Sequence, residues 1–163
     1  MRWQIPNFGD MSSAGLERLM LIEKVLILKS LSIFRDTPEN ILAELAPLMH
    51  EIEYEKNILI FEEGSIGDCM YIIHKGEVKI HKGNTTLAIL KDKEVFGELS
   101  LLDAETRSAS ATTTTNSILF RIDQDPFYEL IESRPEVARG FIKMLCKRLR
   151  AQNERAVRER ESA

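Results

Sequence analysis

Residues 96–111, FGELSLLDAETRSASA, carry one glycine, three acids and one arginine among small and apolar side chains. Phe96 suits a core position, and Gly97 permits a positive φ or a close approach of another group to the backbone. The five residues 98–102 have the pattern of one helical turn that starts with an acid. Exposed backbone N–H groups at such a turn attract anions. The stretch therefore predicts a short helix within a region of strands.

Two charged side chains of this stretch suit one kind of ligand. Arg107 offers paired guanidinium donors, which match phosphate oxygens, and Ser108 adds a further donor. Glu98 only accepts hydrogen bonds, so beside an anion it would bind a hydroxyl and be steadied by Arg107. A cation and an acceptor this close in sequence predict a sugar phosphate. The structural alternative is a buried ion pair between Glu98 and Arg107.

On both sides of this stretch, the sequence has the period of β-strands. Short runs separated by glycine and polar turns read EIEYE (51–55), NILIF (57–61), CMYIIH (69–74), EVKIH (77–81) and TTLAIL (85–90). The turn at Gly83-Asn84 predicts that the last two runs form a hairpin. ASATTTTNSILFRID (109–123) predicts two further strands around a turn at Asn116-Ser117.

Helical patterns flank the strands. Apolar residues recur at helical spacing over 12–30, and Thr37 as N-cap with Pro38 at the first helical position predicts a second helix that ends near Pro47. After an acidic cap at Asp123, one helix is predicted up to Pro135 and a final one from there to about Glu159.

The predicted fold class is mainly β with flanking helices, an antiparallel sandwich or barrel. Residues 1–11 are interpreted as a loose arm or linker, and 12–163 as one domain. Within that domain, residues 12–47 hold the N-terminal helices, 48–123 the strands and 124–163 two C-terminal helices.

The composition narrows the functional class. The chain has 163 residues, 44% of them hydrophobic, and a net charge of −4, which gives no general attraction to nucleic acid or to an anionic membrane. It contains no run of ~18 apolar residues and no secretory signal, so a cytoplasmic protein without a membrane segment is expected. Cys69 and Cys146 lack metal-ligand or disulfide spacing, and His74 and His81 are interpreted as surface histidines.

Residues 96–111 closely resemble the phosphate-binding cassette of cyclic-nucleotide-binding domains, as in the catabolite activator, protein kinase A regulatory subunits and cyclic-nucleotide-gated channels. The family pattern of FGE, L or I, any residue, L, a spacer and then R, S/T/A, A is present without a gap. The upstream segment 62–80, EEGSIGDCMYIIHKGEVKI, is also similar to the family. The resemblance covers roughly residues 22–150 and implies a jelly-roll-like antiparallel β-roll.

The resemblance also implies the roles of individual residues. Glu98 would bind the ribose 2′-hydroxyl, Arg107 would hold the cyclic phosphate, and Gly97 would give a backbone contact. The phosphate and ribose group is completed by Leu99, Ser108 and Ala109. Towards the base, the resemblance implies contacts from Ile80, Leu87, Arg148 and Gln152.

The resulting interpretation is a regulatory sensor for a cyclic mononucleotide, not an enzyme, and with no cofactor besides its ligand. cAMP is favoured, but Ser108 leaves cGMP open, and Glu98 argues against a cyclic dinucleotide. Ligand binding would draw the last helix towards the base, in a module of a larger signalling protein whose output lies elsewhere. The alternatives are a truncated transcription regulator of the catabolite-activator type and a nucleotide-independent dimerisation domain.

The last helix is also a candidate for contacts with partners. Its apolar stripe, which is expected to pack on the core, could in addition pair with its twin in a homodimer. Residues 147–160, KRLRAQNERAVRER, contain five arginines but interleaved acids, so a solvated helix is favoured over a contact with nucleic acid.

Overall fold

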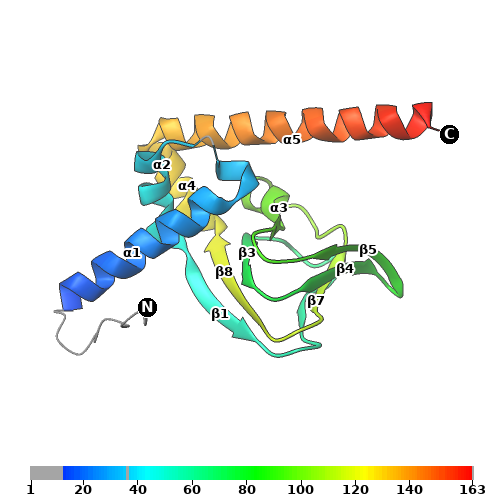
Figure 1. Ribbon diagram of the computed structural model, residues 1–163, viewed down its shortest axis with the longest axis horizontal. Helices are drawn as coiled ribbons and strands as arrows, with labels where there is room; N and C mark the ends of the chain where they lie inside the picture. Colours follow the sequence, from blue (N-terminus) through cyan, green and yellow to red (C-terminus); the bar gives the residue numbers. More distant parts are fainter. Residues whose placement is uncertain (1–12, 36, 163) are drawn as a thin grey trace, which may run out of the picture.

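The computed structural model describes residues 13–35 and 37–162, so the predicted arm at 1–11 lies outside the described residues. Within these ranges, eight strands form two antiparallel four-stranded sheets, ordered β1-β8-β3-β6 and β2-β7-β4-β5 (Figure 1). The strands are β1 His50–Tyr54, β2 Leu59–Phe61, β3 Cys69–Lys75, β4 Val78–Lys82, β5 Thr85–Leu90, β6 Val95–Phe96, β7 Ser110–Thr113 and β8 Ser117–Asp123. The helices are α1 Ser13–Ser30, η2 Ser32–Phe34, α2 Glu39–Leu45, η3 Ala46–Leu48, α3 Glu98–Leu102, α4 Gln124–Ser133 and α5 Pro135–Glu161.

The arrangement confirms the predicted fold class of a mainly β antiparallel roll with helices before and after it. The predicted hairpin is confirmed as well, because Lys82 of β4 pairs with Thr85 of β5 across the Gly83-Asn84 turn. The single helical turn predicted within the strand region is α3.

Strand β3 contributes both to the apolar core inside the roll and to the apolar core between the roll and the helices. Its residues 69–73 are all buried, which a strand permits only when both of its faces are covered. Met70 and Ile72 belong to the apolar cluster shared with the helices, whereas Cys69, Tyr71 and Ile73 belong to the cluster inside the roll. The continuous apolar run in the sequence is therefore a strand with two cores.

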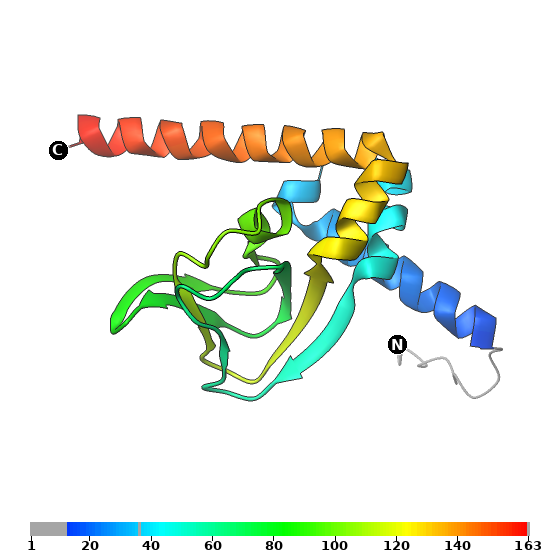
Figure 2. The same ribbon diagram turned by 180° about the vertical axis from the view of Figure 1, so that it is seen from behind.

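The helices α2 and α4 lie at one end of the roll together with the start of α5, and α5 runs from there along one side of the molecule (Figures 1 and 2). At the base of α5, the Phe141 ring packs edge-on against Phe127 of α4, with 4.5 Å between the ring centroids, and against Phe34 of η2, at 5.5 Å. Residues 151–162 are exposed. None of the helices in the described ranges is long and apolar enough to cross a membrane.

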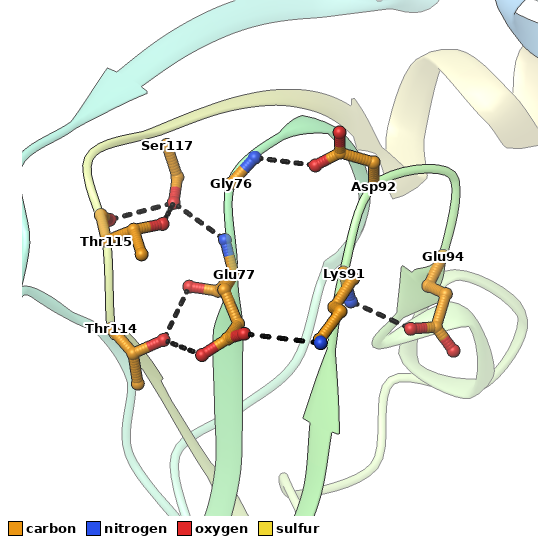
Figure 3. A network of polar contacts seen from close by, with 8 residues as sticks. All are labelled: Gly76, Glu77, Lys91, Asp92, Glu94, Thr114, Thr115 and Ser117. Atoms are coloured by element: carbon orange, nitrogen blue, oxygen red, sulfur yellow. Dashed lines mark hydrogen bonds and ion pairs between the residues drawn. The ribbon is translucent and has the colours of Figure 1, made fainter.

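Three turns of the roll are joined by a polar network (Figure 3). Gly76 donates its N–H to Asp92 Oδ1 at 2.8 Å, and Thr114 donates to Glu77 Oε1 at 2.7 Å. Gly76 has a φ of +116°, and a Cβ there would lie 2.2 Å from Ser117 Oγ, so no other residue fits without displacing this serine. The network fixes the β3–β4 turn against the neighbouring turns.

The start of the second helix differs from the prediction. α2 begins at Glu39, and Pro38 stands at the cap position instead of Thr37. Pro38 keeps an extended ψ of 143° while its carbonyl accepts the Ile41 N–H at 3.0 Å, which is the behaviour of a cap residue. The helix ends at Leu45, near Pro47 as predicted, and Pro47 lies in the short η3 segment.

The turn between the last two strands also differs from the prediction. It lies at residues 114–116, because Ser117 is already the first residue of β8. The Ser117 side chain is buried and donates a hydrogen bond to Thr115 O at 2.9 Å. Serine is common in turns because its hydroxyl bonds nearby backbone groups, and Ser117 makes such a bond from the first position of the strand. The sequence therefore suggested a turn residue at this position.

Candidate functional site

A cavity of about 620 Å³ lies between the roll, α3 and α5. The predicted residues that line it are Ile80, Gly97, Glu98, Leu99, Arg107, Ser108, Ala109 and Arg148. The other lining residues are Phe61, Ala88, Leu90, Val95, Phe96, Ser100, Leu102, Asp103, Glu105, Thr106 and Leu145. Residues more than sixty positions apart in sequence therefore share one cavity.

Gly97 and α3 form one wall of this cavity. Gly97 caps α3 with a left-handed φ of 74°, as its position in the sequence predicted. A Cβ at Gly97 would lie 2.6 Å from Arg107 Nη1, so the backbone and the guanidinium approach each other as closely as glycine allows. Phe96, which is 5% exposed, anchors the start of this wall by stacking on Tyr71.

Arg107 is a buried cation that is held by neutral groups. Its side chain is 6% exposed, and Nη2 donates to Cys69 O at 2.8 Å. The guanidinium carbon lies 4.1 Å from the centroid of the Phe61 ring. Among the described residues, Nε has no hydrogen-bond partner and Arg107 has no carboxylate in ion-pair contact.

The contacts of Arg107 and Glu98 exclude the alternative of a buried ion pair between these two residues. A buried charge needs compensation, and carbonyl groups give only part of it. The expected contact of Arg107 with Glu98 is wrong, since Arg107 binds the carbonyls of Cys69 and Gly97. A buried guanidinium that lines a cavity and has no ion-pair partner among the described residues suits an anion such as a phosphate group.

Glu98 is paired instead with α5. Arg148 Nη1 donates to Glu98 Oε1 at 2.5 Å, with side-chain exposures of 38% for Arg148 and 11% for Glu98. The contact joins the first residue of α3 to α5, which follows all the strands of the roll in sequence. A carboxylate has two oxygens and several lone pairs, so Glu98 retains the capacity to accept a hydrogen bond from a ligand hydroxyl.

The strands β4 and β5 and the helix α5 contribute mostly apolar side chains to the cavity. Ile80 faces Ala88 across the hairpin, and both line the cavity. Leu87 is 53% exposed and is not among the lining residues, because side chains alternate along a strand. Gln152 lines an adjoining groove of about 390 Å³, which shares Leu90, Val95 and Arg148 with the cavity.

Two titratable groups lie directly behind Arg107. The Cys69 Sγ atom is 3.3 Å from Arg107 Nη2, and Tyr71 is 3% exposed on the same face of β3. Burial raises the pKa of the Cys69 thiol and, more strongly, the pKa of the Tyr71 hydroxyl. Both groups are therefore neutral near pH 7, and the positive charge of Arg107 remains uncompensated from this side.

The possible metal ligands of this chain are its histidine, cysteine and acidic side chains. In residues 13–35 and 37–162, no three histidine, cysteine or acidic side chains cluster as metal ligands would. His81 instead hydrogen-bonds Gly83 O and Thr112 Oγ1, each at 2.8 Å.

Comparison with known proteins agrees with this geometry. Residues 51–134 match the family model of the cyclic nucleotide-binding domain, and this range contains α3, Glu98 and Arg107. The chain belongs to the cyclic nucleotide-binding domain family. The family consists of ligand-binding regulatory domains.

Three similar proteins illustrate the relationship. A CRP-like cAMP-activated global transcriptional regulator from Mycobacterium tuberculosis is 33% identical over 132 residues, which are 78% of this chain and 59% of that protein. The N-terminal domain of a transcriptional regulator from Streptomyces coelicolor has a TM-score of 0.70 at 30% identity, covering 78% of this chain and 92% of that one. The Thermus thermophilus catabolite activator protein has a TM-score of 0.64 at 28% identity, covering 76% and 61%.

The chain thus spans about three fifths of the length of the curated relative from Mycobacterium tuberculosis. Within this cyclic nucleotide-binding domain, the structure brings together the residues predicted for phosphate and ribose, and the ligand contacts predicted for them stay predictions. Of the residues predicted for the base, Ile80 and Arg148 share the cavity, Gln152 lies in the adjoining groove, and Leu87 lies outside both.

Sequence reasoning missed several residues of the cavity. Ala88 and Leu90 could have been found from the alternation of TTLAIL, which places them on the opposite face from Leu87. Phe61 and Leu145 carry no such signal, because each belongs to an element that is distant in sequence.

Proposed function

We propose that this domain is a sensor of a cyclic mononucleotide, with cAMP favoured over cGMP, and that it transmits binding through α5. The observation that carries the proposal is Arg107, a buried guanidinium that lines the cavity without an ion-pair partner among the described residues. The cyclic phosphate would supply the missing negative charge, while Ser108 and the backbone at Ala109 would add donors.

The ribose would bind through Glu98. Its carboxylate is 11% exposed at the start of α3 and can accept the 2′-hydroxyl while Arg148 keeps its other contact. Because a carboxylate repels phosphate, this residue would also orient the ligand with its phosphate towards Arg107. Glu98 and Arg107 are connected by the rest of α3 and by the loop that contains Asp103 and Glu105.

The apolar part of the cavity supports cAMP over cGMP. Towards the base, β4, β5 and α5 offer Ile80, Ala88, Leu90 and Leu145, and the charged Arg148. Guanine carries more hydrogen-bonding groups than adenine, so guanine loses more when it is buried against apolar side chains. Adenine should therefore fit this lining better.

The ion pair between Glu98 and Arg148 supports a link between ligand and helix. The 2′-hydroxyl and Arg148 would share the same carboxylate, so the position of α5 and the affinity for the ribose would depend on each other. The link is an energetic one, because a ligand shifts α5 only by as much as it favours one position of that helix over another.

A thermal-shift titration tests the proposal. Ligand at 100 times its dissociation constant should stabilise the domain by about 2.7 kcal/mol, with cAMP acting at lower concentration than cGMP. Linear 5′-AMP serves as the matched control, since it keeps the base and ribose but not the cyclic phosphate. If neither cyclic mononucleotide raised the melting temperature at millimolar concentration, the sensor assignment would be wrong.

The outer face of α5 supports a second proposal, a parallel homodimer. Ile142, Cys146, Leu149, Asn153 and Ala156 follow the alternating four- and three-residue spacing of a coiled-coil seam and are exposed. Ile142 is 60% and Leu149 58% exposed, and an asparagine in such a seam pairs with its own copy in two-stranded coiled coils. Analytical ultracentrifugation should find a dimer that Leu149→Lys dissociates; a monomeric parent protein would exclude this seam.

A further inference from the structure

The short helix α3 is held from outside at its C-terminal end. It has five residues, which are too few to form a stable helix in isolation. The carbonyl groups of its last residues accept no hydrogen bond from within the helix. Three of them accept hydrogen bonds from α4: Gln124 Nε2 donates to Ser100 O at 3.1 Å and to Leu101 O at 3.2 Å, and Tyr128 Oη donates to Leu102 O at 2.5 Å.

The two donors both lie on α4, which follows directly after β8. Gln124 and Tyr128 are four residues apart, which places them on one face of α4. The backbone of Gln124 is itself fixed, since its N–H donates to Asp68 O at 2.8 Å. Both side chains are half-buried, whereas Phe127 between them supplies the apolar contact to the core.

The other end of α3 carries the candidate ligand contacts. Gly97 caps the helix and Glu98 is its first residue, so a rotation or shift of this single turn moves the Glu98 carboxylate directly. Leu101 in the middle of α3 is fully buried, but an apolar contact is not directional and does not fix the rotation of a helix. Directional hydrogen bonds to its carbonyls do.

We propose that Gln124 and Tyr128 are positioning residues, a polar clamp that fixes α3 to α4 and so sets the place of Glu98 in the cavity. The same clamp joins the cavity to the C-terminal helices, because α4 packs on α5 through Phe127 and Phe141. α3 is then tied to these helices at both ends, by the clamp at its C-terminus and by the Glu98–Arg148 ion pair at its N-terminus. This inference deepens the proposed function and rests on it for its ligand arm.

The test compares the parent protein with the double variant Gln124→Met, Tyr128→Phe. These substitutions keep the size of both side chains and remove the donors. The matched control is Ser133→Ala, which removes an exposed hydroxyl of the same helix that bonds only Leu130 O. Circular dichroism and thermal unfolding establish that each variant is folded.

The first arm needs no nucleotide. Hydrogen–deuterium exchange should show the Ser100 and Asp103 amides, which bond Gly97 O and Leu99 O, exchanging at least about tenfold faster in the double variant, which loses all three hydrogen bonds from α4 to α3. Amides of β3 should be unchanged, and the control should match the parent. Unchanged exchange at Ser100 and Asp103 would overturn the clamp, whatever the protein binds.

The second arm measures calorimetric affinity for cAMP and 2′-deoxy-cAMP. The double variant should bind cAMP about tenfold more weakly, and its preference for the ribose form should shrink, because Glu98 is no longer held in place. An undiminished preference would overturn the positioning role. If the parent bound neither nucleotide while the double variant exchanged faster in α3, the proposed function would fail and the clamp would stand.

Discussion

Replacing Gly97 by alanine tests the close contact on which the candidate phosphate site depends. The new Cβ would stand 2.6 Å from Arg107 Nη1 and 3.2 Å from Cys69 O, whereas ordinary contact distances are about 3.5–4.0 Å. The guanidinium would have to withdraw by almost 1 Å, away from the cavity wall. The backbone adds a second cost, because alanine at the φ of +74° loses about 1–2 kcal/mol.

These two effects can be separated with a second glycine. Gly83 in the β4–β5 turn has a φ of +51° and nothing within 4 Å of its potential Cβ, so Gly83→Ala carries the backbone cost alone. Gly83→Ala should lose about 1–2 kcal/mol of unfolding free energy, which lowers the melting temperature by about 2–8 °C, and Gly97→Ala should lose more, because it adds the steric cost to the same backbone cost. Only Gly97→Ala should also weaken cAMP binding, by at least about tenfold, since charge-assisted hydrogen bonds depend on the position of the guanidinium.

The assays are urea denaturation for the unfolding free energy and isothermal titration calorimetry for the dissociation constant. If Gly97→Ala bound cAMP as tightly as Gly83→Ala, the approach of Gly97 to Arg107 would have no role in binding, and the reasoning from the shape of the cavity would be refuted.

Four further perturbations follow from the same structure. Arg107→Leu should abolish detectable cAMP binding in calorimetry while circular dichroism shows the fold retained; binding equal to the parent would remove Arg107 from the phosphate site. Glu98→Gln should weaken cAMP binding and reduce the preference for cAMP over 2′-deoxy-cAMP; an equal loss for both would remove Glu98 from the ribose. Arg148→Met should change the unfolding free energy by no more than about 1 kcal/mol, because the ion pair is partly exposed, yet it should reduce the ligand-induced change in hydrogen exchange of α5; an unaltered change would separate that helix from the ligand. Burial raises the pKa of Tyr71 above that in the unfolded chain, so stability present at neutral pH should decline in urea denaturation as the pH rises above ~10; a Tyr71→Phe variant with the same alkaline decline would assign the loss elsewhere.

The local parts of this structure could be predicted from the sequence. The positive φ of Gly97, the single turn of α3 and the β4–β5 hairpin each depend on a few adjacent residues, and all three were confirmed. The cap of α2 was placed one residue too early because threonine and proline both fit near a helix start, and only the observed ψ of Pro38 distinguishes the two positions.

The partners of the charged side chains could not be predicted in this way. Glu98 and Arg148 are fifty residues apart and meet only because α5 packs beside α3. The bonds from α4 to the end of α3 depend in turn on the packing of α4 against α3. A family pattern identifies which residues fill a position, but the contacts of a side chain are set by elements that the pattern does not include.

The length of α5 has a mechanical consequence. Its 27 residues make a rod of about 40 Å, and about 30 Å of it lies beyond the aromatic contact at Phe141. If the helix pivots on that contact, a tilt of roughly 5° displaces its far end by roughly 3 Å over this length. The displacement would then increase with distance from Phe141. The greatest displacement caused by a nucleotide would occur at the exposed C-terminal end of α5, where a partner or a spectroscopic label could detect it.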